Sequence, residues 1–277
     1  MSLSEALGRP AGFLLSLTAA AGTLVLPMLQ FQRFSEDGRL ARDCGLATAL
    51  LFGLLTVIGG ACDTRRSLED GTAAIALTKP VSRGLWLVGR TLGTALAAAW
   101  FLLIQGGAAM AAEALSPQYH TTGRFADIRG ILLSLAAVAG SLVAAALIHR
   151  FRGGRFVRSA HLLLAVPVWG AALLMPHPHW GILTALPALW MMLLQFGLLA
   201  AALAVRCTAG LTAGLTLGAW LLTVLFLNGT AFIPFDALAG GGAVSPITLL
   251  WLLPQTLAAS LFFGWTGTQL LLSREVA

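Results

Sequence analysis

Residues 131–148 read ILLSLAAVAGSLVAAALI, a stretch without a single charged side chain. An α-helix of about 20 apolar residues spans the hydrocarbon layer of a bilayer, and a helix pairs its own backbone N–H and C=O groups, which lipid cannot do. The stretch therefore predicts a membrane-spanning helix. Similar apolar stretches recur along the chain, and they decide its fold class.

The whole chain has the composition of a membrane protein. Of its 277 residues 58% are hydrophobic and only 10% are charged, and the mean hydropathy is +0.86. These values exclude a water-soluble globule and predict an all-α integral membrane protein with a single transmembrane domain over residues 1–277. We expect about eight spans, near 11–31, 43–62, 86–113, 130–148, 160–176, 182–205, 209–232 and 247–272. The first has no cleavage pattern of a signal peptide, so we expect it to be retained.

The span predicted at 160–176 is the shortest and contains Pro167. Whether it crosses the membrane is therefore open, and a bundle of six to eight spans remains compatible with the sequence.

The distribution of basic residues predicts the orientation. Cytoplasmic loops of membrane proteins carry an excess of Lys and Arg. With both termini in the cytoplasm, twelve of the seventeen basic residues fall on the inner side: Arg9, Arg65, Arg66, Lys79, Arg83, Arg90, Arg150, Arg152, Arg155, Arg158, Arg206 and Arg274. This topology accounts for the net charge of +6, so the charge gives no reason to expect nucleic acid as a partner. The inner arginines would favour anionic membrane lipid.

One polar segment, residues 63–83, interrupts the apolar pattern between the second and third spans. A helix drawn from Asp63 to Leu77 places Leu68 and Ile75 on one apolar stripe, and Pro80 would end it. A short amphipathic helix of this kind lies flat at the interface or presents its stripe to a soluble partner.

The same segment carries a family resemblance. The runs 69–72 (EDGT), 77–83 (LTKPVSR) and 87–93 (LVGRTLG) resemble the E-x-G-T, L-x-K-P-V-S-R and L-x-G-[KR]-x-x-G motifs of ABC-2 type transporter permeases. Among these, the segment is most similar to the branch that includes the permease of nitrous-oxide-reductase maturation. The motifs cover about a tenth of the chain, and a weaker likeness extends over residues 193–227.

The resemblance implies the permease subunit of an ATP-driven transporter in the inner membrane, with transport directed outward as in an exporter. It implies a separate ABC ATP-binding subunit as partner and a second permease subunit, in a homodimer or a heterodimer. ATP and Mg²⁺ would bind the partner ATPase, and this chain would hold no cofactor and no catalytic residue. The partner-binding residues of the coupling segment would be Arg66, Leu68, Glu69, Gly71, Thr72, Ile75, Lys79, Pro80 and Arg83.

Two sets of small or polar residues lie within predicted spans. Glycines recur every fourth residue at Gly89 and Gly93, and at Gly210, Gly214 and Gly218. Such faces let helices approach closely, either within one chain or across a dimer. Gln105 and Gln195 lie at membrane depth, where they could line a substrate path or join two helices by a hydrogen bond.

Other chemistries have little support in the sequence. The chain contains no G-x-x-x-x-G-K-[ST] phosphate-binding loop. No carboxylate lies in the middle of a predicted span, which disfavours a proton- or sodium-coupled secondary transporter. His177 and His179 alone make a weak metal site, and the three cysteines have no metal-ligand spacing, so no metal is expected. An intramembrane enzyme and a membrane scaffold that transports nothing remain alternatives.

Overall fold

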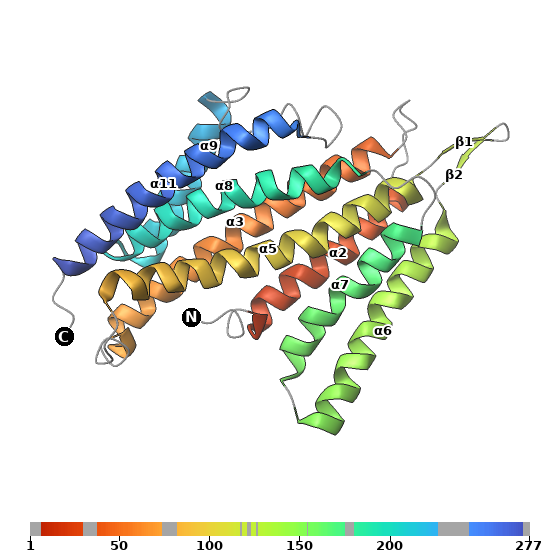
Figure 1. Ribbon diagram of the computed structural model, residues 1–277. Coiled ribbons are helices and arrows are strands. Elements are labelled where there is room, and N and C mark those ends of the chain that lie inside the picture. Colours follow the sequence, from red (N-terminus) through yellow and green to blue (C-terminus); the bar gives the residue numbers. More distant parts are fainter. Residues whose placement is uncertain are drawn as a thin grey trace.

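A computed structural model describes residues 7–29, 38–73, 82–116, 118–120, 123–125, 127–153, 155–174, 180–226 and 244–273. These ranges contain eight long α-helices, and consecutive helices run in opposite directions (Figure 1). The helices are α2 (Pro10–Leu29), α3 (Arg39–Glu69), α5 (Arg83–Leu115), α6 (Ile128–Arg152), α7 (Phe156–Leu174), α8 (Ile182–Ala204), α9 (Ala209–Phe226) and α11 (Pro246–Leu272). The prediction of an all-α polytopic bundle is confirmed.

Seven of these helices are long and apolar enough to cross a membrane by length and composition, and α9 is the shorter exception. The helix α7 is continuous through Pro167, although proline has no backbone N–H to donate to the preceding turn. A two-stranded antiparallel hairpin, β1 (Gln118–His120) and β2 (Gly123–Phe125), joins α5 to α6 and is the one addition to the predicted helices in the described ranges.

The helix α3 is longer at both ends than the predicted span 43–62. It begins at Arg39 inside the stretch expected to be an external loop, and it ends at Glu69 inside the predicted coupling segment. Arg42 explains the first difference. Its guanidinium is only 3% exposed and pairs with Glu113 of α5 and with Asp43, so the first turn is held against α5 instead of lying in a loop.

The helix α5 lies at the centre of the bundle and contacts α2, α3, α7 and α8 (Figure 1). Its buried face is rich in alanine and glycine, and small side chains let neighbouring helices approach closely where lipid supplies no hydrophobic drive. The pair α6 and α7 packs against α2 at one side, and α11 packs against α8 and α5 at the other.

The start of α2 and the end of α11 lie at the same end of the bundle (Figure 1). We call it the basic end, and the other the opposite end. At the basic end Arg9, before α2, pairs with Asp63 of α3, and Arg206, after α8, donates to Ser273 after α11 over 2.6 Å. The basic end also holds the α6/α7 turn with its four arginines, so the structure brings together the charged segments that the sequence assigned to one side.

Candidate functional site

The predicted coupling helix is not a separate helix. Residues 63–69 continue α3, and Gly71 then adopts the left-handed backbone region with φ 69°, which favours glycine and ends a helix. The prediction of one helix from Asp63 to Leu77 is therefore wrong. Ile75, Lys79 and Pro80 lie outside the described residues.

Leu68 faces the interior of the protein. It is 6% exposed and packs in what we call the Leu68 cluster, with Ala73, Leu87 of α5, Ala201 and Val205 at the end of α8, and Leu271 of α11. The prediction that Leu68 presents an apolar stripe to a partner is wrong. Leu68 and Ala73 fasten the described part of the segment to α5, α8 and α11.

Polar contacts strengthen this attachment. The Arg65 guanidinium donates to the Val205 carbonyl over 3.3 Å, and Arg90 Nε donates to Thr64 Oγ1 over 3.2 Å. The Arg90 guanidinium also lies over the Trp86 ring, 5.3 Å from its centroid. The end of α3 is thus tied directly to α5 and α8, so a displacement of this end would move the other two helices with it.

The outward face of the segment is polar. Arg66 is 71% exposed, Glu69 is 46% exposed, and Asp70 and Thr72 are exposed as well. Two contacts hold this face in shape: Arg65 Nε pairs with Glu69 over 2.6 Å, and the Thr72 hydroxyl donates to the Ser67 carbonyl over 3.2 Å. A surface with both charge signs is suited to a polar partner that carries the complementary charges.

The start of α5 forms the other border of this face. Ser82 caps the helix by accepting a hydrogen bond from Leu85 N over 3.2 Å, and Arg83 is its first residue, half-buried. Of the predicted partner-binding residues, the structure therefore brings Arg66, Glu69, Thr72 and Arg83 to one end of the bundle with part of each side chain accessible.

The glycine series separate into two kinds. Gly93 is buried on α5, whereas a Cβ at Gly89 would meet nothing within 4 Å. Added Cβ atoms at Gly210, Gly214 and Gly218 of α9 would also meet nothing within 4 Å. This α9 face makes no close helix contact within the described chain. It is therefore available for contact with lipid or with a second subunit.

Both predicted glutamines join helices. Gln105 is fully buried, and its Nε2 donates to Thr23 Oγ1 over 2.5 Å and to the Gly45 carbonyl over 3.2 Å, joining α5 to α2 and α3. Gln195 Nε2 donates to Thr256 Oγ1 over 3.0 Å and joins α8 to α11. Neither residue lines the two gaps described next.

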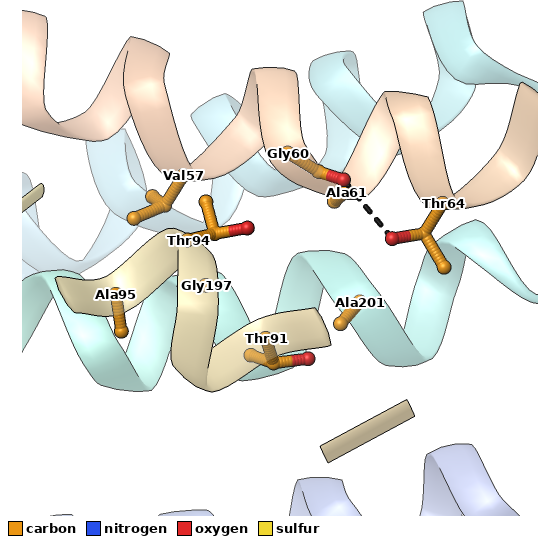
Figure 2. A pocket seen from close by; sticks show the side chains of 9 residues that line it. All are labelled: Val57, Gly60, Ala61, Thr64, Thr91, Thr94, Ala95, Gly197 and Ala201. Carbon is orange, nitrogen blue, oxygen red and sulfur yellow. Dashed lines mark hydrogen bonds between the residues drawn. The ribbon is translucent and has the colours of Figure 1, made fainter. Parts of the chain in front are cut away.

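A narrow gap lies between α3, α5 and α8 in the half of the bundle near the basic end. Figure 2 shows Thr91 and Thr94 of α5 and Thr64 of α3 around it. The gap is partly open to the outside and has a volume of about 10 Å³, room for about one water molecule. The Thr64 hydroxyl donates to the Gly60 carbonyl over 3.0 Å, and Gly197 and Ala201 of α8 complete the wall. The gap exists because the lining residues on all three helices are small and their side chains do not fill it.

A second, wider cleft lies on the other side of the contact between Gly60 and Thr94, which border both spaces. It runs between the halves of α2 and α3 near the basic end, with α5 as its floor, is open on one side and has a volume of about 110 Å³. Arg9 lies at its end. Sequence analysis did not single out Arg9 or Asp63, although both flank predicted spans at the same side of the membrane.

A buried serine and histidine also meet in the bundle. Ser16 Oγ of α2 lies 2.9 Å from His161 Nε2 of α7, and His161 Nδ1 lies 3.3 Å from the Leu7 carbonyl. The arrangement has the atoms of a nucleophile and base, but both side chains are at most 3% exposed and neither borders the two gaps. It joins α2 to α7 and offers no space for a substrate.

The described residues contain no group of three or more His, Cys, Asp or Glu side chains that could hold a metal ion. Comparisons with known proteins add no further assignment: no family model, no curated protein and no solved structure matches the chain.

Proposed function

We propose that the chain is the permease subunit of an ABC-2 type ATP-driven transporter in the inner membrane, with both termini in the cytoplasm. One observation supports this most: residues 66–73, which include the E-D-G-T motif resembling that family, present exposed polar side chains at the basic end and are fastened to α5, α8 and α11 through the Leu68 cluster. A partner ATPase that moves this segment would therefore move several spans together.

The docking surface in this proposal is the polar face of Arg66, Glu69, Asp70 and Thr72. Movement of the partner ATPases on ATP binding and hydrolysis would displace the end of α3, and the Arg65–Val205 and Arg90–Thr64 hydrogen bonds would carry the displacement to α8 and α5. The spans would then rock and expose a central path to each side alternately. A second permease subunit would complete the transporter, and the open glycine face of α9 is one surface that it could contact.

ATP hydrolysis by purified proteins tests this function. We expect the chain alone to hydrolyse no ATP, and an ATP-binding subunit encoded beside its gene to bind it in proteoliposomes and to hydrolyse ATP faster when bound. Robust hydrolysis by this chain alone would refute the proposal. Failure of every neighbouring ATP-binding subunit to associate would refute it as well.

Charge reversal tests the docking surface. Arg66→Glu combined with Glu69→Lys replaces attraction by repulsion at two exposed positions, so we expect the ATPase to bind roughly tenfold more weakly. The matched control is Arg150→Glu with Arg152→Glu on the exposed α6/α7 turn, at the same end but on other helices. Equal retention of the ATPase by both double variants would show that residues 66–72 are not the docking surface.

Reporter fusions test the orientation. The arginine-rich basic end predicts cytoplasmic signals from fusions after Arg158 and Arg274, and an external signal from a fusion after Ala239. A cytoplasmic signal at Ala239 would refute the proposed arrangement of spans.

A further inference from the structure

The cleft between α2 and α3 has the form of a lipid-binding groove. Ala11, Gly12 and Leu15 of α2 form one wall and Leu55, Thr56 and Gly59 of α3 the other, with Ala97 of α5 in the floor. Leu55, Gly59 and Ala11 are exposed, so the cleft opens sideways from the bundle. In a membrane this side faces the acyl chains of lipids.

Between Ala11 and Ala97 the lining is mostly apolar and offers few hydrogen-bonding groups to a polar solute. The two hydroxyl groups at the lining already donate to carbonyls of their own helices, Thr56 to Phe52 over 2.8 Å and Thr94 to Arg90 over 3.1 Å, so only their oxygen atoms remain as acceptors. A sugar or an ion that entered would lose most of its water for few hydrogen bonds, which is costly. An acyl chain loses nothing, because it already lies in an apolar environment.

The cleft has a length and a position that suit an acyl chain. It extends from Arg9, before the first turn of α2, to Leu15 and Leu55. Six or seven helical residues correspond to about 10 Å along the axis, a third of the hydrocarbon layer. The cleft thus begins at the level of the lipid headgroups and ends within the apolar layer.

The arginines at the polar end of the cleft favour an anionic headgroup. Arg9 pairs with Asp63, and Arg66 lies 3.7 Å from the same carboxylate, so among the described residues two guanidinium groups flank one carboxylate at the mouth. The planar fork of a guanidinium matches a phosphate. The mouth therefore places two arginines at the level of the lipid headgroups, where basic residues favour anionic lipid.

We propose that this cleft binds one anionic phospholipid, with an acyl chain between α2 and α3 and the phosphate on Arg9. The site is independent of the proposed ATPase, because every residue that forms it belongs to this chain. A bound acyl chain would fill the cleft between α2 and α3. Near the opposite end the described helices pack closely and leave no such space.

The test is native mass spectrometry of the full chain in detergent with added phosphatidylglycerol or phosphatidylcholine of equal chain length. We expect wild-type protein to keep one phosphatidylglycerol in preference to phosphatidylcholine. Gly59→Leu should reduce this adduct roughly fivefold or more, since a Cβ at Gly59 meets nothing within 4 Å and the new side chain would occupy the cleft without disturbing the fold. Gly22→Leu, at an equally open glycine farther along α2, is the control and should keep the adduct.

A second pair of variants tests the headgroup. Arg9→Gln should lower the preference for phosphatidylglycerol about fivefold, the effect of one basic residue near an anionic lipid surface. Arg66→Gln removes the other guanidinium beside Asp63 but none of the cleft lining, so it should lower the preference less. Equal adducts in wild type, Gly59→Leu and Arg9→Gln would overturn the proposal. Loss in Gly59→Leu with no change of preference in Arg9→Gln would overturn the assignment of an anionic headgroup.

Photo-crosslinking supplies a readout that does not depend on a variant. Phosphatidylglycerol with a diazirine on an acyl chain should label the wild-type chain within residues 9–15 or 55–60. Labelling elsewhere only, for instance on the open faces of α6 or α11, would overturn the site. Because these measurements use the chain without a partner, they remain decisive even if no ATPase is found to bind it.

Discussion

The two ends of α3 meet α5 in different ways. Near the opposite end the helices touch directly: a Cβ at Gly45 would lie 2.8 Å from Ala109 Cβ, and one at Gly38 would lie 2.5 Å from the Glu113 carbonyl oxygen. The Arg42–Glu113 ion pair, 3.0 Å long, adds a charged contact that is almost completely buried.

Towards the basic end the same two helices pack closely at one point and leave space beside it. Gly60 packs against Thr94 even more closely than Gly45 packs against Ala109, but a narrow gap lies on one side of this contact and the cleft on the other. Contacts resume at the last turn of α3, where the Leu68 cluster holds the segment.

Space beside α3 near the basic end and close packing near the opposite end favour motion at the first and resist it at the second. A well-packed interface has few alternative arrangements, whereas small residues around a gap allow helices to shift. In the proposed transporter the partner ATPase would act at the end that can move, and the four predictions below test this difference.

The largest expected effect follows loss of the buried charge pair. Glu113→Leu removes one of the two carboxylates that pair with the buried Arg42 side chain among the described residues, so we expect a loss of about 3 kcal/mol in the free energy of unfolding. Glu69→Leu breaks the Arg65 pair at the basic end, which is half-exposed, and should cost under about 1 kcal/mol. Unfolding in mixed detergent micelles would measure both, and equal losses would contradict the difference between the ends.

Leu68→Ala should have the next largest effect. Removing a buried leucine side chain from the Leu68 cluster costs about 2 kcal/mol or more in the free energy of unfolding. Leu85→Ala, at a position 64% exposed on α5, is the control and should cost far less. If Leu68→Ala instead left stability unchanged and abolished ATPase binding, Leu68 would be a docking residue after all.

Methyl groups added to two glycines of α3 compare the packing directly. Gly45→Ala places a Cβ against Ala109 and should destabilise the protein by about 1–3 kcal/mol. Gly59→Ala adds a Cβ in open space and should be neutral or stabilise the helix by up to about 1 kcal/mol. The thermal midpoints of the two variants in one detergent give the comparison, and similar destabilisation would show that no cleft exists at Gly59.

The interhelical glutamines should have the smallest effects. Hydrogen bonds between helices in membranes contribute about 0.6 kcal/mol each, so Gln105→Leu, which breaks two, should cost about 1 kcal/mol and Gln195→Leu about half as much. If either residue lined the substrate path, its variant would instead lose transport at unchanged stability, measured as ATPase-dependent uptake or release in proteoliposomes.

Sequence reasoning located the helices well because apolar length alone decides where a chain can cross lipid. The predicted spans 182–205 and 247–272 agree within one residue with α8 and α11. It failed at the ends of α3, where charges are buried or paired: a count of charged residues places Arg42 outside the predicted span, and only its pairing with Glu113 on another helix explains why α3 begins before it.

For the candidate site the limits were of the same kind. The motif residues pointed to the segment after α3, because polar residues between two spans are conspicuous against an apolar chain; that a partner binds there stays a prediction. The stripe pattern correctly indicated that Leu68 packs against another apolar surface. A periodic pattern contains no information about whether that surface belongs to a partner or, as here, to α5, α8 and α11.

The sequence by itself determined that this protein is a bundle of apolar helices with its arginines gathered at one end, since length, hydropathy and charge are local properties of the chain. Tertiary structure alone decided which side chains are hidden, that Leu68 fastens the segment, and that a cleft with Arg9 at its mouth opens between α2 and α3. These features arise from contacts between residues far apart in the chain, such as Arg9 with Asp63, and the packing of whole helices sets the distances between them.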